Sequence, residues 1–145
     1  MKKLTIAGAV LSIFLAAIGG AAQTFKVYPG AKKLDNESAE IGKTLPAGSE
    51  GSVYVTNDSY DKVVAFYKGI GKEYTMPYMK KGTKLPNGQE LLSVYFIFDG
   101  AASIATSKNW AKVQRPYVGS VKMNGMTPEY SDIRDVTAIV ATQKK

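Results

Sequence analysis

The chain contains no cysteine and no histidine. Without cysteine it has no disulfide, no cysteine-ligated zinc or iron–sulfur site, no thiol nucleophile and no lipid-modified cysteine. Without histidine it has no Ser-His-Asp triad, no histidine-ligated metal and no histidine proton shuttle. General acid–base chemistry is left to carboxylates, lysines and tyrosines. We therefore expect no metal and no other cofactor, and an enzyme is the class with the least support.

Arginine is scarce as well, since only Arg115 and Arg134 are found among the 19 basic residues. Arginine is the side chain that favours bidentate recognition of phosphates and bases, so we do not expect specific nucleic-acid binding. The net charge of +7 still suits an anionic envelope component, a glycan or another protein as partner. The lysine pairs at 32–33 and 80–81 are explained more simply as solvated surface that protects sheet edges.

The first 22 residues are typical of a secretory signal peptide. Lys2 and Lys3 precede an apolar run over residues 4–18, and small residues follow at 19–22. A membrane anchor is the competing interpretation, but a largely apolar stretch of 15 residues falls short of the roughly 20 that a spanning helix needs. We predict cleavage after Ala22 and a location in the bacterial periplasm or outside the cell. Losing two lysines lowers the net charge from +7 to +5.

The rest of the chain has a length and an apolar content, 45% of all residues, that suit one globular domain. Residues 23–51 are expected to form an irregular arm with a short strand at 25–28, which ends at Pro29. Apolar residues at 60, 63, 64 and 67 predict a helix over 59–69, with Asp58 as N-cap. The glycines that follow, at 69 and 71, are interpreted as the end of this helix and not as a phosphate-binding loop.

Strands are predicted around this helix at 52–56, 74–80, 91–98, 110–114, 117–123 and 136–142. The segments on either side of Pro116 are two strands or one bent strand, and residues 124–132 are expected to be a loop. The fold class is therefore α+β, with residues 52–145 as the domain. We expect one main helix packed on a four- to five-stranded, mostly antiparallel sheet in two layers.

A patch of aromatic and cationic side chains is the best candidate for a binding site in the sequence. Aromatic faces beside guanidinium groups suit sugar rings, peptides or nucleobases. A large aromatic residue is, however, more often partly buried core, so a structural role competes with this hypothesis. The candidate residues are Trp110, Arg115, Tyr117, Tyr130 and Arg134.

Carboxylates gather in the same part of the chain and allow a second class of function. Two carboxylates across a cleft would support glycan hydrolysis. The spacing matches no calcium loop, and arginine–carboxylate pairs in a turn explain the cluster structurally. The candidates are Asp99, Glu129, Asp132 and Asp135.

Several short segments together resemble a group of small exported bacterial proteins of unknown function. They are VYPGA at 27–31, TNDSYDKV at 56–63, FYK at 66–68, QRPY at 114–117 and DIRDVT at 132–137. The resemblance to this group, with its YPGA segment and T-x-D-S…V…FYK helix, implies an envelope location and carries no catalytic residues. We therefore expect a non-enzymatic binding or accessory domain. The alternatives are a glycan hydrolase and a subunit that self-assembles through exposed strand edges such as residues 25–28.

Overall fold

The computed structural model describes residues 24–78 and 80–145, and the predicted signal peptide lies outside them. In chain order the elements are β1 (Lys32–Leu34), α1 (Asp35–Thr44), β2 (Ser49–Thr56), α2 (Tyr60–Lys68), β3 (Lys72–Tyr74), β4 (Leu92–Ile97), β5 (Asn109–Arg115), β6 (Tyr117–Asn124), β7 (Thr127–Arg134) and β8 (Thr137–Lys144). None of the helices in these ranges is long and apolar enough to cross a membrane.

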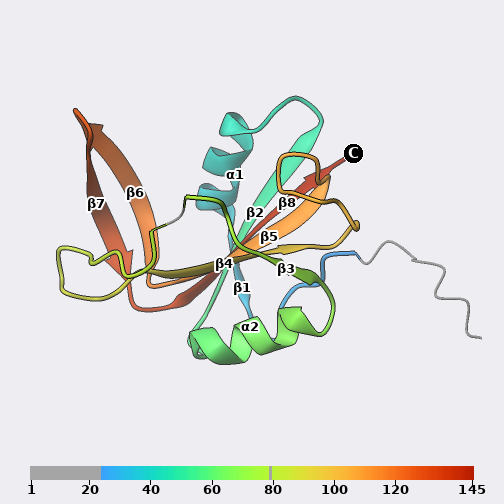
Figure 1. The fold of residues 1–145 in the computed structure, drawn as a ribbon, viewed down its shortest axis with the longest axis horizontal. Helices are drawn as coiled ribbons and strands as arrows, with labels where there is room; N and C mark the ends of the chain where they lie inside the picture. The colour runs from blue at the N-terminus through green and yellow to red at the C-terminus, as the bar shows by residue number, and fades with distance from the viewer. Residues whose placement is uncertain (1–23, 79) are drawn as a thin grey trace, which may run out of the picture.

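Six of the strands form one sheet in the order β1-β2-β8-β5-β4-β3. Each neighbouring pair is antiparallel, and β8 lies between β2 and β5 near the middle of the sheet. The chain leaves β5 at the Arg115–Pro116 peptide, which is cis, and continues into the separate hairpin β6–β7. Figure 1 shows this hairpin projecting from one side of the molecule, with α1 and α2 on opposite sides of the main sheet.

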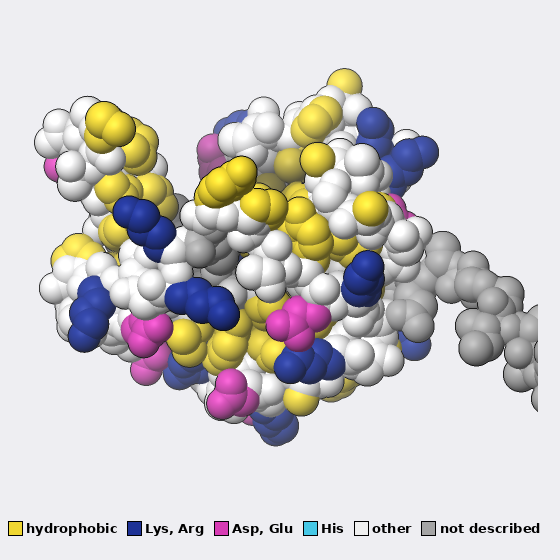
Figure 2. Space-filling model, viewed as in Figure 1, with side chains coloured by type: hydrophobic (Ala, Val, Ile, Leu, Met, Phe, Trp, Pro, Cys, Tyr) yellow, Lys and Arg dark blue, Asp and Glu magenta, His cyan; other side chains and the backbone are white. Residues whose placement is uncertain are grey.

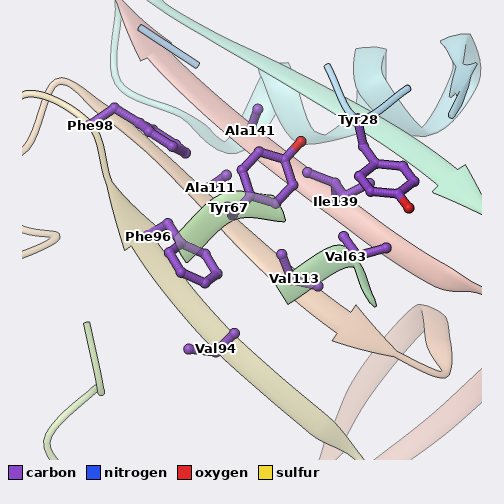
Figure 3. Close-up of a cluster of buried hydrophobic side chains, with 10 residues drawn as sticks. All are labelled: Tyr28, Val63, Tyr67, Val94, Phe96, Phe98, Ala111, Val113, Ile139 and Ala141. Carbon is purple, nitrogen blue, oxygen red and sulfur yellow. The ribbon is translucent and has the colours of Figure 1, made fainter. Parts of the chain in front are cut away.

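The main core lies between α2 and one face of the sheet (Figure 3). Val63 and Tyr67 of α2 are fully buried there against Phe96 and Val113 of the sheet. Burying each side chain of this size contributes about 1.5–3 kcal/mol. The hydroxyl of Tyr67 donates a hydrogen bond of 2.9 Å to the carbonyl of Lys26, so the one polar group of this side chain is satisfied.

The second face of the sheet is only partly covered, by α1. This helix packs on β1 and β2, where the backbone of Gly51 approaches the side chain of Ile41 so closely that a Cβ would collide with it. The hydroxyl of Ser38 accepts a hydrogen bond from the backbone N–H of Val53, 2.9 Å away. A smaller core, with Val53, Tyr117 and Ala138 buried, lies on this face of the sheet, and Ile41 of α1 packs against it. On the same face, β5 and β4 lie beyond α1.

The predicted class, α+β with a mostly antiparallel sheet, is confirmed, but the number of elements is wrong. The structure has eight strands in two sheets instead of four or five in one. It also has a second helix, α1, in the segment expected to be an irregular arm. This helix was missed because its sequence is mostly polar and small, with Ile41 as its one large apolar residue.

Local predictions around these elements have mixed outcomes. The helix over 59–69 is confirmed as α2, but its N-cap is Ser59, whose Oγ accepts from the N–H of Lys62. Asp58 instead accepts a hydrogen bond of 2.6 Å from the hydroxyl of Tyr28. Residues 25–28 form no strand, and the loop expected at 124–132 contains most of β7. The strand expected at 74–80 is wrong in its bounds, since β3 lies at 72–74 and shares only Tyr74 with the predicted range.

Candidate functional site

A groove of about 520 Å³ lies on the second face of the sheet, between α1 and the base of the β6–β7 hairpin. Its floor is formed by β5 with its neighbours β4 and β8, the strands beyond the edge of α1. Glu37, Glu40 and Ile41 of α1 form one wall, and Val118 and Val121 of the hairpin form the other. The lining is mainly apolar, and the volume falls within the range of small-molecule sites.

Strand alternation brings the floor residues together. Trp110, Lys112 and Gln114 stand at every second position of β5, so their side chains share one face. In the register of the sheet, Lys112 lies opposite Tyr95 of β4 and Val140 of β8. The rings of Tyr95 and Trp110 are 5.9 Å apart between centroids. The floor is therefore an aromatic and aliphatic surface with one ammonium group near its middle.

The charges around the groove are unequally compensated. Glu37 is paired with Arg134 at 3.1 Å, and Glu40 with Lys43 at 2.6 Å. Within 24–78 and 80–145, no carboxylate lies within ion-pair distance of Lys112. Burial lowers the pKa of the Lys112 ammonium because this charge is partly removed from water. Lys112 is therefore the uncompensated charge of the groove.

The base of the hairpin is fixed by Arg134. Its guanidinium lies over the ring of Tyr117, 5.1 Å from the centroid, and pairs with Asp132 at 2.7 Å and with Glu37 of α1. Hydrogen bonding to Arg134 lowers the pKa of Asp132, and burial raises the pKa of Tyr117. Gly119 packs so closely on the carboxylate of Asp132 that a side chain at this position would displace it. These contacts join the base of the hairpin to α1 and so fix the two walls of the groove relative to each other.

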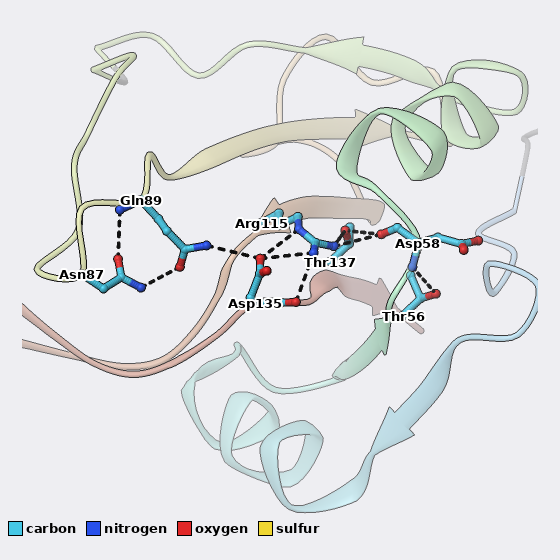
Figure 4. Close-up of polar contacts among 7 residues, drawn as sticks. All are labelled: Thr56, Asp58, Asn87, Gln89, Arg115, Asp135 and Thr137. Carbon is cyan, nitrogen blue, oxygen red and sulfur yellow. Dashed lines mark hydrogen bonds and ion pairs between the residues drawn. The ribbon is translucent and has the colours of Figure 1, made fainter.

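The other predicted arginine, Arg115, belongs to a separate network at the end of β5 (Figure 4). Its Nε donates to the carboxylate of Asp135 at 3.2 Å, and its Nη1 donates to the carbonyl of Asp58 and the hydroxyl of Thr137, both at 3.1 Å. Gln89 reaches the same carboxylate from the loop before β4. The network joins β5, β8 and the β2–α2 connection, and Arg115 does not line the groove.

The structure thus divides the five residues that the sequence singled out. Trp110 and Tyr117 line the groove, and Arg134 contacts Tyr117 beside it. Tyr130 lies on the hairpin opposite Val121 but does not line the groove, and Arg115 lies elsewhere. Sequence reasoning missed Tyr95 and Lys112. The sequence does contain a signal for Lys112. It lies two residues after Trp110 on a strand whose other face is apolar, so the two side chains share the face that does not enter the main core.

The four candidate carboxylates each have a local partner. Asp99 accepts hydrogen bonds from the backbone of Lys108 and Ala101 and from Ser107, and Glu129 accepts one from Asn124. Asp132 and Asp135 pair with the two arginines. In the part of the chain that the structure describes, no three acidic residues are grouped so that they could hold a metal ion. The arrangement gives little support to a two-carboxylate hydrolase.

The groove is therefore the feature of the described residues best suited to hold a ligand. Comparison of the chain with models of protein families, with curated proteins and with solved structures found no match.

Proposed function

We propose that the protein is a non-enzymatic binding domain of the bacterial periplasm or cell exterior, which holds a small, largely apolar ligand in the groove. The observation that carries this proposal is the uncovered floor over β5 and β4. Aromatic and aliphatic side chains of a sheet are normally covered by a second layer, because their exposure to water is unfavourable. Here Tyr95, Trp110 and Val140 line an open hollow instead.

The shape of the site supports a small molecule more than a long chain. Walls on two sides, formed by α1 and the hairpin, would surround a ligand that lies on the floor. The arginine contacts at the hairpin base hold these walls in place before a ligand arrives, which reduces the entropy lost on binding. The location is supported by the basic and apolar N-terminal residues 2–18.

The experiment is a titration with the uncharged fluorescent probe N-phenyl-1-naphthylamine. Trp110 is the only tryptophan of the chain, so energy transfer from Trp110 reports that the probe has bound, and substitutions in the groove and away from it show whether it binds there. Val121→Asp places a charge on the hairpin wall and should weaken probe binding at least about ten-fold, since it puts a carboxylate beside the apolar ligand.

Val27→Asp is the matched control. Val27 and Val121 are both exposed valines, at 45% and 53%, but Val27 does not line the groove. The control variant should bind the probe like the parent protein. Equal weakening by both substitutions, or no saturable energy transfer in the parent protein, would contradict the proposal.

A second candidate, self-association, is favoured by the hairpin itself. Val121, Met123 and Met126 are exposed on β6 and the following turn, and Figure 2 shows hydrophobic side chains gathered on this projecting element. An isolated two-stranded hairpin is marginally stable, so covering it with a second copy would be favourable. Sedimentation velocity over a wide concentration range tests this candidate, and an unchanging monomer would remove it.

A further inference from the structure

We infer that the ligand of the groove is an amphipathic acid, with an apolar body on the floor and one carboxylate paired with Lys112. This inference rests on the proposed function and names the chemical class of its ligand. It starts from the position of Lys112, which lies on β5 between Tyr95 and Val140 of the neighbouring strands. The backbone of Lys112 therefore belongs to the floor of the groove and not to its rim, and its side chain lines the groove from there.

The charges of the surrounding elements favour an anion at this point. The two glutamates of α1 that line the groove are already paired, Glu37 with Arg134 and Glu40 with Lys43. Lys112 also borders an adjacent hollow of about 290 Å³, whose other charged lining residues are Lys80, Lys81 and Glu90. The smaller hollow therefore has an excess of positive charge. In the groove, Lys112 is the one charged lining residue without an ion-pair partner among the described residues, so a ligand carboxylate would supply the missing partner of a partly desolvated ammonium.

A single carboxylate fits this site better than a phosphate group. A dianionic phosphate is usually bound by several cationic or N–H donors. Here the guanidinium beside the groove, that of Arg134, is already engaged by Asp132 and Glu37. The amide of Gln114, next on the same face of β5, donates to the carbonyl of Pro116 at 3.2 Å. One ammonium remains, which matches one negative charge.

The remainder of the floor sets the chemistry of the ligand body. Trp110 lies two residues before Lys112 on the same face, and its ring adjoins that of Tyr95. Ala138 and Val140 of β8 continue this surface towards α1. An alkyl chain or a flat ring that begins at the carboxylate can lie on these side chains, where apolar contact stabilises it.

The experiment compares three ligands of the same chain length, decanol below its solubility limit and the two charged ligands below their micellar concentrations. Decanoate, decanol and decylammonium are titrated into the protein, and binding is followed by the fluorescence of Trp110 and by calorimetry. We expect decanoate to bind at least about ten-fold more tightly than decanol, as for a hydrogen bond to a charged group, and decylammonium to bind most weakly.

Substitution at Lys112 locates the effect. Lys112→Met keeps the length of the side chain without its charge, and should reduce decanoate binding to the level of decanol while leaving decanol binding unchanged. Lys112→Arg should retain most of the preference for decanoate. Lys32→Met is the matched control, because it removes the same charge from an exposed residue of the edge strand β1.

The outcomes separate the two proposals. If decanol and the uncharged naphthylamine probe bind but decanoate is not preferred, an acid ligand is wrong and the apolar groove stands. If the preference for decanoate survives in Lys112→Met, the pairing with Lys112 is wrong and the inference falls, while the apolar groove stands. If no ligand of either set changes the Trp110 signal, both proposals fall. If Lys112→Met does not fold, the order of the three ligands on the parent protein and on Lys112→Arg still decides the question.

Discussion

Replacing Arg115 by alanine separates the structural network from the groove. The side chain is 24% exposed and makes four hydrogen bonds, to the carboxylate and the carbonyl of Asp135, the hydroxyl of Thr137 and the carbonyl of Asp58. Thr137 is fully buried, and its own hydroxyl also donates to the Asp58 carbonyl at 2.7 Å. The substitution therefore weakens the junction of β5, β8 and the β2–α2 connection, but the hydrogen bond between Thr137 and the Asp58 carbonyl remains.

The expected cost follows from the environment of each contact. The two hydrogen bonds on the buried side are worth about 1 kcal/mol each. The ion pair with Asp135, whose carboxylate is largely exposed, contributes less than about 1 kcal/mol. We predict that Arg115→Ala lowers the free energy of unfolding by about 2–3 kcal/mol and the midpoint of thermal unfolding by roughly 10 °C.

Urea denaturation followed by circular dichroism measures this loss, with binding of the naphthylamine probe as the second readout. Asp135→Asn is the matched variant, and should cost less than about 1 kcal/mol because it removes only the exposed ion pair. Arg115→Ala should leave the affinity of the folded protein for the probe unchanged. A loss below about 0.5 kcal/mol would refute the stabilising role of this network. A large loss of probe affinity at full stability would show instead that Arg115 takes part in binding.

Further predictions concern the core, two glycines, one carboxylate and the N-terminus. Tyr67→Phe should lower the free energy of unfolding by about 1 kcal/mol, because the hydrogen bond from the buried Tyr67 side chain to the carbonyl of Lys26 is lost; a change near zero in urea denaturation would show that water replaces it. Gly71→Ala should destabilise by about 1–3 kcal/mol, since its Cβ would lie 2.7 Å from the ring of Phe98, whereas Gly42→Ala, within α1 with open space around it, should stabilise by about 0.5–1 kcal/mol. The reverse order in thermal melts would contradict the packing at both positions. Burial of Asp99 opposes its ionisation, but hydrogen bonds from two backbone N–H groups and a serine hydroxyl outweigh it and lower the pKa. The stability from Asp99 is therefore fully present above the unfolded-state pKa near 4 and lost as the pH falls towards the folded-state value, so the difference in unfolding free energy between the parent protein and Asp99→Asn should shrink on acidification; a difference independent of pH would contradict this. Mass spectrometry of protein secreted by an expressing bacterium should give the mass of residues 23–145, and a mass that retains residues 1–22 would contradict export with cleavage.

The elements that were predicted well are those whose side chains repeat at one clear period. The apolar residues at 60, 63, 64 and 67 predicted α2 correctly, because this spacing puts them on one face of a helix that can pack on the sheet. The apolar run of β4 and the β-branched run of β8 predicted strands for a different reason, since short runs that are apolar on both faces suit a strand inside a sheet. The absence of cysteine and histidine likewise limits the chemistry whatever the fold.

Only the tertiary structure decided the remaining elements and the site. The helix α1 and the strand β7 have weak patterns of their own, and they are held by contacts distant in sequence, such as that between Glu37 and Arg134. Lys112 and Tyr95 become neighbours through the pairing of β4 with β5, 17 residues apart in the chain. Local sequence sets which face a side chain takes on its strand. Which strands lie side by side, and which half of a sheet remains uncovered, depends on packing summed over the whole chain.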